Sequence, residues 1–392
     1  MAAKVKLRPV DEQVMVITGA SSGIGLVTAR MAAARGARVV LTARNERALK
    51  RAVKEIEAAG GAAMYVVADV ADEDAVERVA EEAVSEYGRI DTWVNNASTS
   101  IYGRAWEVPL ADKRRLLDVN FWGVVHGCRS ALPRLQERGG ALINVGSVLS
   151  DQAIPMQGMY VAAKHAVKGY TDALRMEIEE QGLPVSVTLV KPASIDTPFF
   201  DHARNYMPEG DPKPAPPVYA PEVVAKAILR AAERPVRDVF AGGSAKAMAA
   251  MGHHAPRLTD RLMEKTQVSG QQKDGPPSGR PDNLYEPVDQ DGVERGSYDG
   301  KVLERSAYTS AALRPVAGAL AAIGLGLAVA AGVRALRGAR RGDDASAREP
   351  QDDAGTARRG RGRSGTARRD AGTRASNGVA DSAESMFHVP RA

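Results

Sequence analysis

The stretch VMVITGASSGIG (residues 14–25) runs from an apolar, β-branched segment through a glycine-rich turn into the start of a helix. Its glycines, Gly19, Gly23 and Gly25, have a G-x-x-x-G-x-G spacing, which differs from the commonest dinucleotide fingerprint, G-x-G-x-x-G. Glycines at such a turn permit a tight bend, and they let a pyrophosphate approach the backbone at the positive N-terminus of the helix. The stretch therefore predicts a strand–turn–helix unit that holds a dinucleotide.

Short apolar runs separated by helical patterns follow this unit. Together with the first run they predict seven strands, at residues 14–19, 37–43, 62–69, 90–96, 141–147, 184–192 and 237–242. Their apolar residues occupy consecutive positions, as expected for strands buried on both faces of a parallel sheet. Amphipathic segments such as residues 46–60, which end on a glycine, lie between them. The alternation predicts a doubly wound, Rossmann-type α/β domain.

Composition divides the chain into six segments. They are an N-terminal arm (1–12), the Rossmann domain (13–245), a helical extension (246–268), a polar linker (269–312), an apolar segment (313–335) and a disordered, Arg-rich tail (336–392). Within the domain, a proline-rich stretch at residues 207–217 could cover a ligand at the carboxyl edge of the sheet or could form a plain surface loop.

Charge is distributed unevenly along the 392 residues. The formal net charge is +5, and the 13 Arg and 8 Asp or Glu of residues 334–392 account for all of it. The rest of the chain is neutral overall, which argues against a nucleic-acid-binding surface on the folded part. The tail, in which GTARR occurs twice, is either solvated or binds an anionic lipid or nucleic acid.

Neither a disulfide nor a metal site is expected. Cys128 is the only cysteine, and we expect it to be a small buried residue on a helix in a protein of a reducing compartment. His253 and His254 are adjacent, so a helix would direct them to different faces and they make a poor metal pair. The first residues lack the apolar run of a secretory signal.

Residues 315–333 form a run of 19 residues without a charge, which reaches the length of a membrane-spanning helix. The run is rich in Ala and Gly, which allow close helix packing, so it could also be a core or dimer-packing helix. We expect a cytoplasmic domain tethered by this helix, which either spans the membrane or lies on anionic lipid at its interface.

The end of the second predicted strand bears on the choice of dinucleotide. An acidic residue there would hold the ribose 2′-hydroxyl of NAD, whereas Arg suits the 2′-phosphate of NADP. The strand ends in Ala43, Arg44 follows, and neither position carries a carboxylate. We therefore expect NADP(H) as the cofactor, unless Arg44 is only a surface charge at the start of a helix.

Four motifs occur in order along the chain: TGxxxGxG from Thr18, NNAS from Asn95, Ser147 thirteen residues before a tyrosine, and YxxxK from Tyr160 to Lys164. A helix places this Tyr and Lys on one face, with a rise of about 6 Å between them. Over residues 12–245 the motifs make the chain similar to the short-chain dehydrogenase/reductase family, and the likeness does not extend to the C-terminal third.

The resemblance implies roles for four side chains. Tyr160 would be the general acid in ketone reduction and the general base in alcohol oxidation. A free tyrosine titrates at about 10, so the charges of Lys164 and of an oxidised nicotinamide would have to move its pKa toward about 7. Lys164 would also hold the nicotinamide ribose, Ser147 would hydrogen-bond the substrate oxygen, and Asn120 matches the family's proton-relay asparagine.

The resemblance also implies which residues hold the cofactor. Besides the three glycines, Arg44, Tyr160 and Lys164, these are Ser21, Ser22, Ile24, Asp69, Val70, Asn96, Ala97, Ile195 and Thr197. Asp69 would contact the adenine, and Ile195 and Thr197 would meet the nicotinamide carboxamide. The family commonly has glycine where this chain has Ser98 and Ala193, and Ala193 could alter the backbone turn near the nicotinamide.

The leading interpretation is an NADP(H)-dependent carbonyl reductase or alcohol dehydrogenase that acts on a small-molecule ketone or secondary alcohol and forms a homo-oligomer. A sugar-nucleotide epimerase or dehydratase would need a larger C-terminal substrate domain. A catalytically silent NADP-binding sensor or membrane scaffold would not need the catalytic residues, and a nucleic-acid binder rests only on the tail. Phe199, Phe200, Tyr206 and Met207 lie near the expected pocket and hint at an apolar substrate, although they could simply pack a lid.

Overall fold

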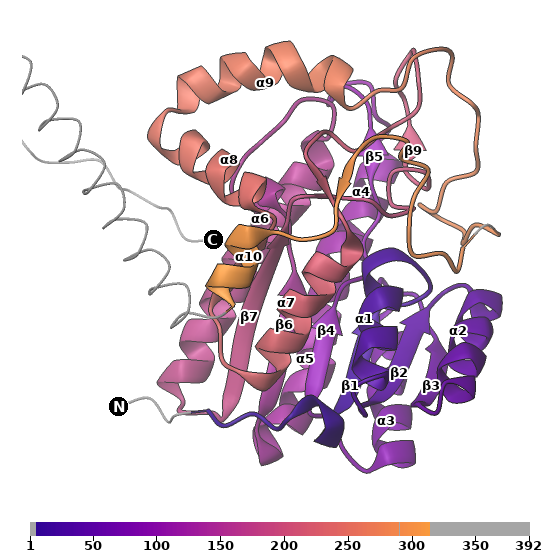
Figure 1. Cartoon of the computed structure of the whole chain (residues 1–392), viewed down its shortest axis with the longest axis vertical. Coiled ribbons are helices and arrows are strands. Elements are labelled where there is room, and N and C mark those ends of the chain that lie inside the picture. Colours follow the sequence, from indigo (N-terminus) through magenta and orange to yellow (C-terminus); the bar gives the residue numbers. More distant parts are fainter. Residues whose placement is uncertain (1–4, 290, 314–392) are drawn as a thin grey trace, which may run out of the picture. The chain divides into compact units, whose positions relative to one another are not determined.

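A seven-stranded parallel sheet forms the centre of the computed structural model, which describes residues 5–289 and 291–313 (Figure 1). The spatial order of its strands is β11-β7-β6-β4-β1-β2-β3. Successive strands are added toward one edge from β1 to β3 and toward the other edge from β4 to β11, so the strand order reverses between β1 and β4. Their bounds are β1 (Val14–Thr18), β2 (Arg38–Ala43), β3 (Ala62–Val67), β4 (Thr92–Asn95), β6 (Gly140–Val145), β7 (Val185–Pro192) and β11 (Asp238–Ala241). The predicted Rossmann-type sheet is confirmed, and open sheets of this kind bind ligands where the strand order reverses.

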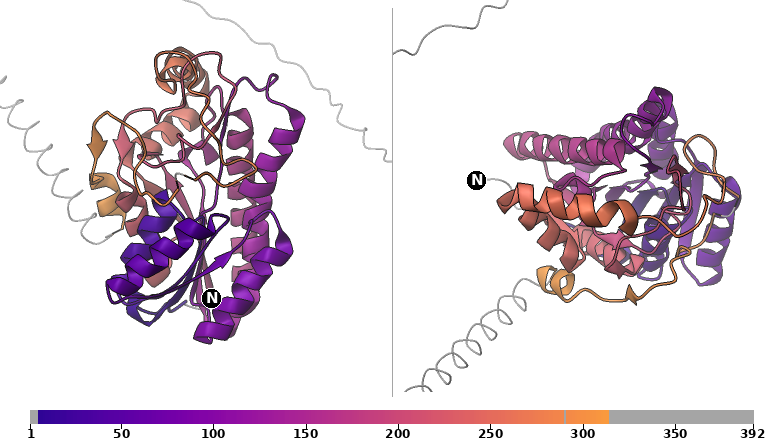
Figure 2. Two further views of the ribbon diagram at one scale, coloured as in Figure 1. Left: turned by 90° about the vertical axis from the view of Figure 1, so that its right-hand side faces the viewer. Right: turned by 90° about the horizontal axis from the view of Figure 1, so that it is seen from above.

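Alternate residues of the strands enter two separate cores, one on each face of the sheet. From β1, Met15 and Ile17 pack into the first core, whereas Val14 and Val16 pack into the second. The helices are α1 (Gly23–Ala33), α2 (Glu46–Ala58) and α7 (Pro221–Glu233) on the first face, and α3 (Glu73–Tyr87), α5 (Gly123–Arg138) and α6 (Gly158–Glu180) on the second (Figure 2). Burial on both sides explains why the strands are apolar on consecutive positions.

Local sequence signals set the ends of the helices. The Asn45 side chain accepts from the backbone N–H of Ala48 at 3.0 Å and caps α2, and Asp72 does the same for Ala75 at 3.1 Å at the start of α3. Helix α3 ends where Gly88 adopts φ +75°, a left-handed conformation that glycine tolerates best.

Smaller elements gather mostly at the carboxyl edge of the sheet, toward the top of Figure 1. A short three-stranded sheet has the order β12-β10-β8, and β5 pairs with β9. These strands are β5 (Ile101–Tyr102), β8 (Ser194–Ile195), β9 (Arg204–Asn205), β10 (Val218–Tyr219) and β12 (Val302–Leu303). The helices are α4 (Leu110–Leu117), α8 (Gly243–His254), α9 (Pro256–Gly270) and α10 (Ala307–Ala312), with single turns η1 (Val10–Glu12), η2 (Asp118–Trp122) and η3 (Val148–Ser150).

The polar segment after α9, which the sequence predicts as a linker, packs back onto the domain. Lys273 N donates to Asp211 O at 2.8 Å, and β12 pairs with β10. In α10, the hydroxyl of Thr309 donates to Phe240 O at 3.2 Å and accepts from Gly242 N at 2.9 Å. Part of the polar groups of this segment are thus hydrogen-bonded to the domain.

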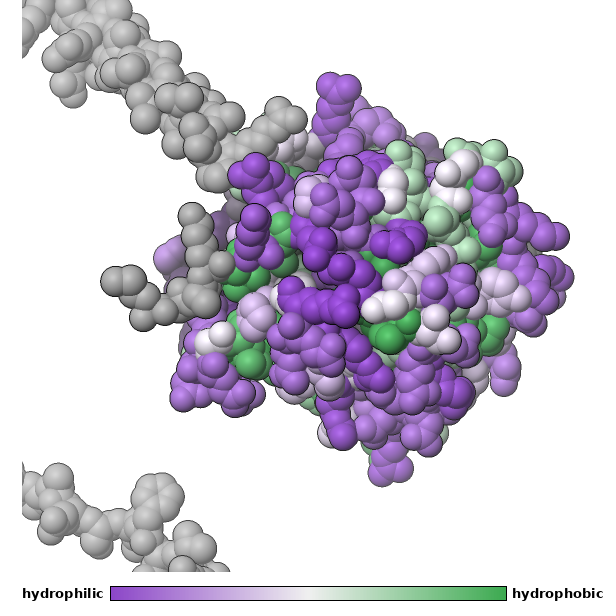
Figure 3. Space-filling view, turned by 90° about the horizontal axis from the view of Figure 1, so that it is seen from below, coloured by the Kyte–Doolittle hydropathy of each residue, from purple (hydrophilic) through white to green (hydrophobic). Residues whose placement is uncertain are grey.

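The opposite edge of the sheet has an ordinary solvated surface. Seen from below in Figure 3, hydrophilic side chains cover most of this face and hydrophobic ones form small scattered groups.

Cys128 of α5 is free and buried, as predicted, and burial raises the pKa of its thiol to about 12. Such a thiol stays protonated and unreactive at neutral pH.

Among residues 5–289 and 291–313, no helix is long and apolar enough to cross a membrane. The apolar helix predicted at 315–333 and the tail predicted at 336–392 lie outside the described residues.

Candidate active site

A cavity of about 620 Å³ lies along the carboxyl edge of the sheet. The loops after β1, β2, β4, β6 and β7 line it together with residues of α6, α8 and α9. Because parallel strands all end at one edge, residues far apart in sequence meet there. Of the predicted site residues, all but Gly25 and Asn120 are among the described residues that line the cavity.

Side chains would not fit at the glycine positions of the glycine-rich turn. Gly19 and Gly23 have φ values of +64° and +52°. A Cβ atom on Gly19 would lie 2.7 Å from the Cα of Ala97, and one on Gly25 would lie 2.2 Å from Gly19 O. Gly25 therefore lets α1 pack tightly against the turn, while Gly19 and Gly23 face the cavity, which suits close approach of a pyrophosphate.

The loop after β4 is bonded to the loop after β1. Asn96 Nδ2 donates to Thr18 O at 2.9 Å, and the backbone N–H of Ala97 donates to the Thr18 hydroxyl at 3.0 Å. Asn95 lies deeper, where its Nδ2 donates to Asn144 Oδ1 at 2.9 Å. The first asparagine of NNAS therefore supports the sheet, and the second fixes the turn at the cavity.

The residues after β2 and β3 form a charged group at one end of the cavity. Asp69 Oδ2 accepts from Arg115 Nη2 at 2.5 Å, and Asp69 Oδ1 accepts from the backbone of Ala71 at 3.0 Å. Burial lowers the pKa of the Arg44 guanidinium, which still remains charged at neutral pH. Arg44 thus lines the cavity as a half-buried cation, and the nearby carboxylate already has an arginine partner.

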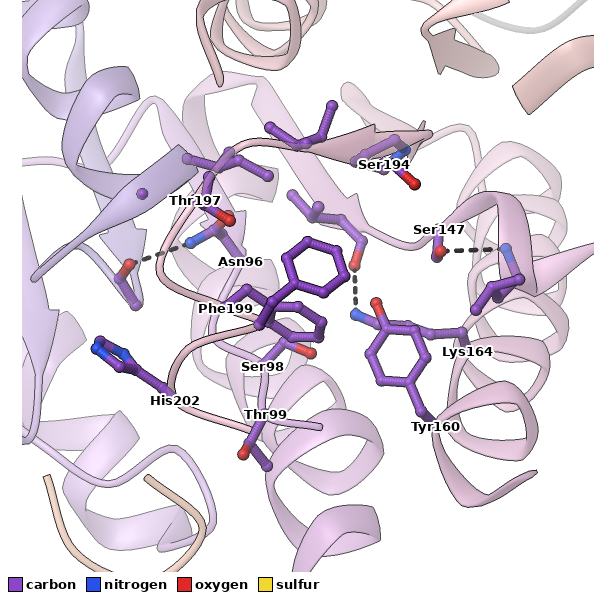
Figure 4. Close-up of a pocket in the computed structure, with 18 of the residues that line it drawn as sticks. Asn96, Ser98, Thr99, Ser147, Tyr160, Lys164, Ser194, Thr197, Phe199 and His202 are labelled. Carbon is purple, nitrogen blue, oxygen red and sulfur yellow. Dashed lines mark hydrogen bonds between the residues drawn. The ribbon is translucent and has the colours of Figure 1, made fainter. Parts of the chain in front are cut away.

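Tyr160, Lys164 and Ser147 lie together farther along the cavity (Figure 4). The Lys164 side chain is 2% exposed, and its Nζ donates to Val145 O at 2.9 Å. The Ser147 hydroxyl accepts from the backbone N–H of Leu149 at 3.1 Å, which fixes its position at the start of η3. The arrangement places a phenol, a serine hydroxyl and an ammonium around one small volume.

The Tyr160 pKa is not lowered in the protein without cofactor. Burial raises it to about 12, and hydrogen bonds with Ser147 and Ser98 oppose this only in part. Burial also lowers the pKa of Lys164 to about 8, and the lysine directs its hydrogen bond to a backbone carbonyl. Desolvation therefore dominates the Tyr160 pKa without cofactor, and the expectation that Lys164 together with an oxidised nicotinamide lowers it toward about 7 stays a prediction.

Known proteins are similar to this chain. The model of the short chain dehydrogenase family matches residues 13–207. The uncharacterized oxidoreductase YxnA of Bacillus subtilis is 48% identical over 324 residues, which cover 82% of this chain and 91% of that protein. The chain belongs to the short-chain dehydrogenase/reductase family.

Solved structures of this family have the same fold. A short-chain dehydrogenase/reductase from Burkholderia phymatum, in complex with NAD, is 27% identical with a TM-score of 0.59, covering 65% of this chain and 97% of that structure. An alcohol dehydrogenase from the archaeon Thermococcus sibiricus, complexed with 5-hydroxy-NADP, is 26% identical with a TM-score of 0.52, covering 58% of this chain and 95% of that structure.

Asn120, which matches the family's relay asparagine, is fully buried in the π-helical turn η2 between α4 and α5. Its Oδ1 accepts from the backbone N–H of Thr99 and its Nδ2 donates to Thr99 O, both at 2.8 Å. Ser98 Oγ donates to the same Oδ1 at 3.2 Å. These contacts give Asn120 a supporting role for the loop at 98–99, and its relay role stays a prediction.

The two departures from the family pattern are accommodated. Ser98 adds a hydroxyl that lines the cavity beside Tyr160. Ala193 has an ordinary backbone conformation, since Met156, with φ 70°, is the only non-glycine residue in the described part of the chain with positive φ. A left-handed glycine is therefore not required at position 193 here.

Two groups of cavity residues were not predicted. The first lies on α8 and α9 and comprises Met248, Met251, Leu262 and Met263; the second follows α9 and comprises Asn283, Pro287, Val288 and Asp291. Neither group has a motif. A polar segment of this length without regular structure inside a compact domain is uncommon and often functional, which is the one signal that could have indicated the second group.

Proposed function

We propose that the protein is an NADP(H)-dependent oxidoreductase that interconverts an apolar ketone and its secondary alcohol. One observation supports this most strongly. One part of the cavity is lined by the glycine-rich turn and another by apolar side chains, and between them lie Tyr160, Lys164 and Ser147. A cofactor on one side and a substrate on the other would meet at the phenol.

The residues around the first half of the cavity fit a nicotinamide dinucleotide. Gly19 and Gly23 line the cavity without side chains, which suits the approach of a pyrophosphate, and Thr197 lines it next to Gly23, where the carboxamide is expected. The 2′-phosphate of NADP would meet the guanidinium of Arg44, whereas the end of β2 offers the ribose of NAD no carboxylate, since Ala43 and Arg44 stand there. Asp69, which follows β3, already pairs with Arg115. When bound, the cofactor supplies the hydride.

The protonation states favour ketone reduction. With a pKa of about 12, the Tyr160 phenol keeps its proton at neutral pH and can donate it to a carbonyl oxygen as charge develops there. The hydroxyls of Ser147 and Ser98 can hydrogen-bond the same oxygen. Alcohol oxidation needs the phenolate, so it requires positive charge in addition to Lys164.

The second half of the cavity suits a bulky apolar substrate. Its wall includes Ile154, Phe199, Met248, Met251, Leu262 and Met263. The Phe199 ring stands edge to face with Tyr160, their centroids 5.5 Å apart, so that aromatic surface borders the reacting hydroxyl (Figure 4). Methionines adapt to irregular ligands. Pro216 and Pro217, from the proline-rich stretch, line the cavity and support the ligand-covering alternative for that stretch.

A spectrophotometric screen tests this function directly. Ketones graded in size and polarity are offered with NADPH and with NADH, and loss of absorbance at the reduced nicotinamide band is followed. We expect turnover with large apolar ketones and NADPH. Failure of every carbonyl and alcohol tested, with intact dinucleotide binding, would favour the silent NADP-binding sensor instead.

The sequence alone supports a further part of the proposal, a membrane tether at residues 315–333. Because the proposed reaction needs NADPH, we place the catalytic domain on the cytoplasmic side.

A further inference from the structure

Residues 283–289 and 291–297 contribute Asn283, Pro287, Val288 and Asp291 to the lining of the cavity. They belong to the orange segment above the indigo elements in the left view of Figure 2. We propose that this segment, called the strap below, is an outer wall of the cofactor site and must open before the dinucleotide enters or leaves. The inference rests on the cofactor assignment made above. It assigns to the site residues that lie outside the 13–207 match to the family.

The strap is held first by the loop after β2. The guanidinium of Arg44 donates to Tyr285 O at 2.6 Å and also to Asn283 O. The adjacent residue, Asn45, donates from Nδ2 to Val288 O at 2.9 Å. The side chain predicted to choose the dinucleotide therefore also fastens the strap.

A second attachment is at the glycine-rich turn. The backbone N–H of Gly23, the first residue of α1, donates to Val293 O at 2.9 Å. One residue farther, Glu294 pairs with Arg30 of α1 at 2.5 Å. The strap thus touches the helix N-terminus at which the pyrophosphate is expected.

The third attachment is to the loop after β7, which carries Thr197. Gly296 N donates to Asp196 Oδ1 at 3.2 Å, and Ser297 N donates to Asp201 Oδ2 at 2.8 Å. Arg295 pairs with Glu222 of α7 at 2.9 Å and with Glu304 at 3.0 Å. The strap is consequently bonded to three of the loops that would hold the cofactor.

The inner face of the strap offers polar groups to a ligand. Asn283, Pro287, Val288 and Asp291 line the cavity. Asp291 Oδ1 is buried and has no hydrogen-bond partner among the described residues. Buried polar atoms of native proteins are nearly always bonded, so this oxygen is suited to accept from a ribose hydroxyl or an adenine amino group.

The strap can open without unfolding the domain. Leu284, fully buried, anchors its beginning, and Val288 is the only other residue among 283–289 and 291–297 with a buried apolar side chain. Most of the remaining attachments are exposed or partly buried hydrogen bonds and ion pairs, which open locally at low cost compared with a packed core; the Asn45–Val288 bond is buried. Cofactor exchange should therefore be limited by strap opening.

Two variants loosen the strap without changing a residue that lines the cavity. Arg295→Ala removes the pairs with Glu222 and Glu304, and Glu294→Ala independently removes the pair with Arg30. The matched control is Arg35→Ala, which removes an ion pair with Glu233 at the other end of α7, away from the strap. NADPH is bound to each protein, displaced with excess NADP⁺, and its dissociation rate is followed by stopped-flow fluorescence.

We expect each strap variant to release NADPH about tenfold faster than the wild type, since a lost charged contact at an interface acts mainly on the off-rate, and we expect the control to stay within about twofold. Hydrogen exchange gives a second readout: NADPH should slow exchange of amides in the strap and leave α3 unchanged. Equal NADPH release rates in all four proteins would overturn the proposal that the strap encloses the cofactor. Faster hydrogen exchange of the strap amides with NADPH would also overturn it, because the cofactor would then displace the strap. A wild type that binds neither NADPH nor NADH would instead overturn the cofactor assignment and the strap with it.

Discussion

The Nζ atom of Lys164 lies 5.5 Å from the centre of the Tyr160 ring, one helical turn farther along α6. Both side chains are buried, and their pKa values move in opposite directions from the usual ones: that of Tyr160 rises to about 12 and that of Lys164 falls to about 8. Each shift favours the neutral form, as desolvation requires. The pair is therefore set for proton donation before any cofactor binds, and its basic state depends on added positive charge.

Removing the phenolic hydroxyl should abolish proton transfer and little else. We expect Tyr160→Phe to lower kcat by about 10²- to 10⁴-fold, the usual contribution of a general acid, while the dissociation constant for NADPH changes by less than about threefold because other loops hold the cofactor. Steady-state NADPH oxidation and fluorescence titration measure the two quantities. Tyr170→Phe, on the same helix but not among the described residues lining the cavity, is the control. Residual turnover within tenfold of the wild type would rule out the assigned acid.

The buried lysine predicts how stability depends on pH. Between about 8, its folded pKa, and 10.5, its ordinary value, the folded protein loses the Lys164 proton while the unfolded chain keeps it. The unfolded state then binds more protons, so the free energy of unfolding rises with pH. At about 1.4 kcal/mol per pKa unit, Lys164 contributes a rise of about 2 kcal/mol between pH 8 and 10 in the protein without cofactor, and the Cys128 thiol, whose pKa burial raises to about 12, offsets part of this rise above pH 9. The raised pKa of Tyr160 acts oppositely, but only above pH 10.

Urea unfolding at pH 7 to 10 checks this, with Lys164→Met expected to remove the rise. Lys168→Met is the matched control one turn farther along α6, since Asp172 raises the pKa of that lysine and no such rise follows from it. A wild type and a Lys164→Met variant with the same pH dependence would show that the ammonium is not desolvated in the folded protein.

Much of this site could be predicted because local patterns specify it. Apolar runs such as residues 14–19 indicate strands buried on both sides, and the spacing of Gly19, Gly23 and Gly25 indicates a turn that allows close approach. The strap could not be predicted, because its hydrogen bond between Gly23 and Val293 joins residues 270 positions apart in a polar segment without periodicity. The raised pKa of Tyr160 without cofactor could not be predicted for a related reason: helical spacing gives proximity to Lys164, but burial, which dominates the shift, depends on the whole fold.

Cofactor choice should depend on Arg44. The wild type is expected to prefer NADPH, and Arg44→Asp should erase or reverse the preference, raising the KM for NADPH by about tenfold or more, because a like charge replaces a charge-assisted bond to phosphate. Arg47→Asp is the control: Arg47 is exposed, bonds Asp289 of the strap and is not among the described residues lining the cavity. Comparing kcat/KM for both dinucleotides in the three proteins separates phosphate recognition from strap attachment. Equal use of NADH and NADPH by the wild type would contradict the assignment.

Substrate size should depend on α8. Met251 lines the cavity, so Met251→Trp should lower kcat/KM for bulky ketones by about ten- to a hundredfold, within the range that pocket volume controls. Small ketones should be reduced as before, since they need only the volume beside Tyr160. His253→Trp places the same indole on the exposed surface of α8 and serves as control. A uniform loss for all ketones would place the substrate elsewhere.

The position at which the chain can be shortened follows from α10. Thr309 bonds Phe240 O and Gly242 N, and Leu313 packs against the core, so a chain that ends at residue 310 would lose part of this helix. A chain ending at Leu313 keeps α10 and omits the apolar run at 315–333.

Five Arg follow this apolar run and three basic residues precede it. By the positive-inside rule this small bias favours a cytoplasmic tail, but a folded domain of about 300 residues that needs NADPH weighs more. We expect the full chain to sediment with membranes, and the chain ending at Leu313 to stay in the supernatant with its NADPH oxidation intact. A wash at high salt distinguishes an interfacial helix, which it should release, from a spanning one, which only detergent should release. If the full chain remains in the soluble fraction at low salt, the run is a packing helix and no tether exists.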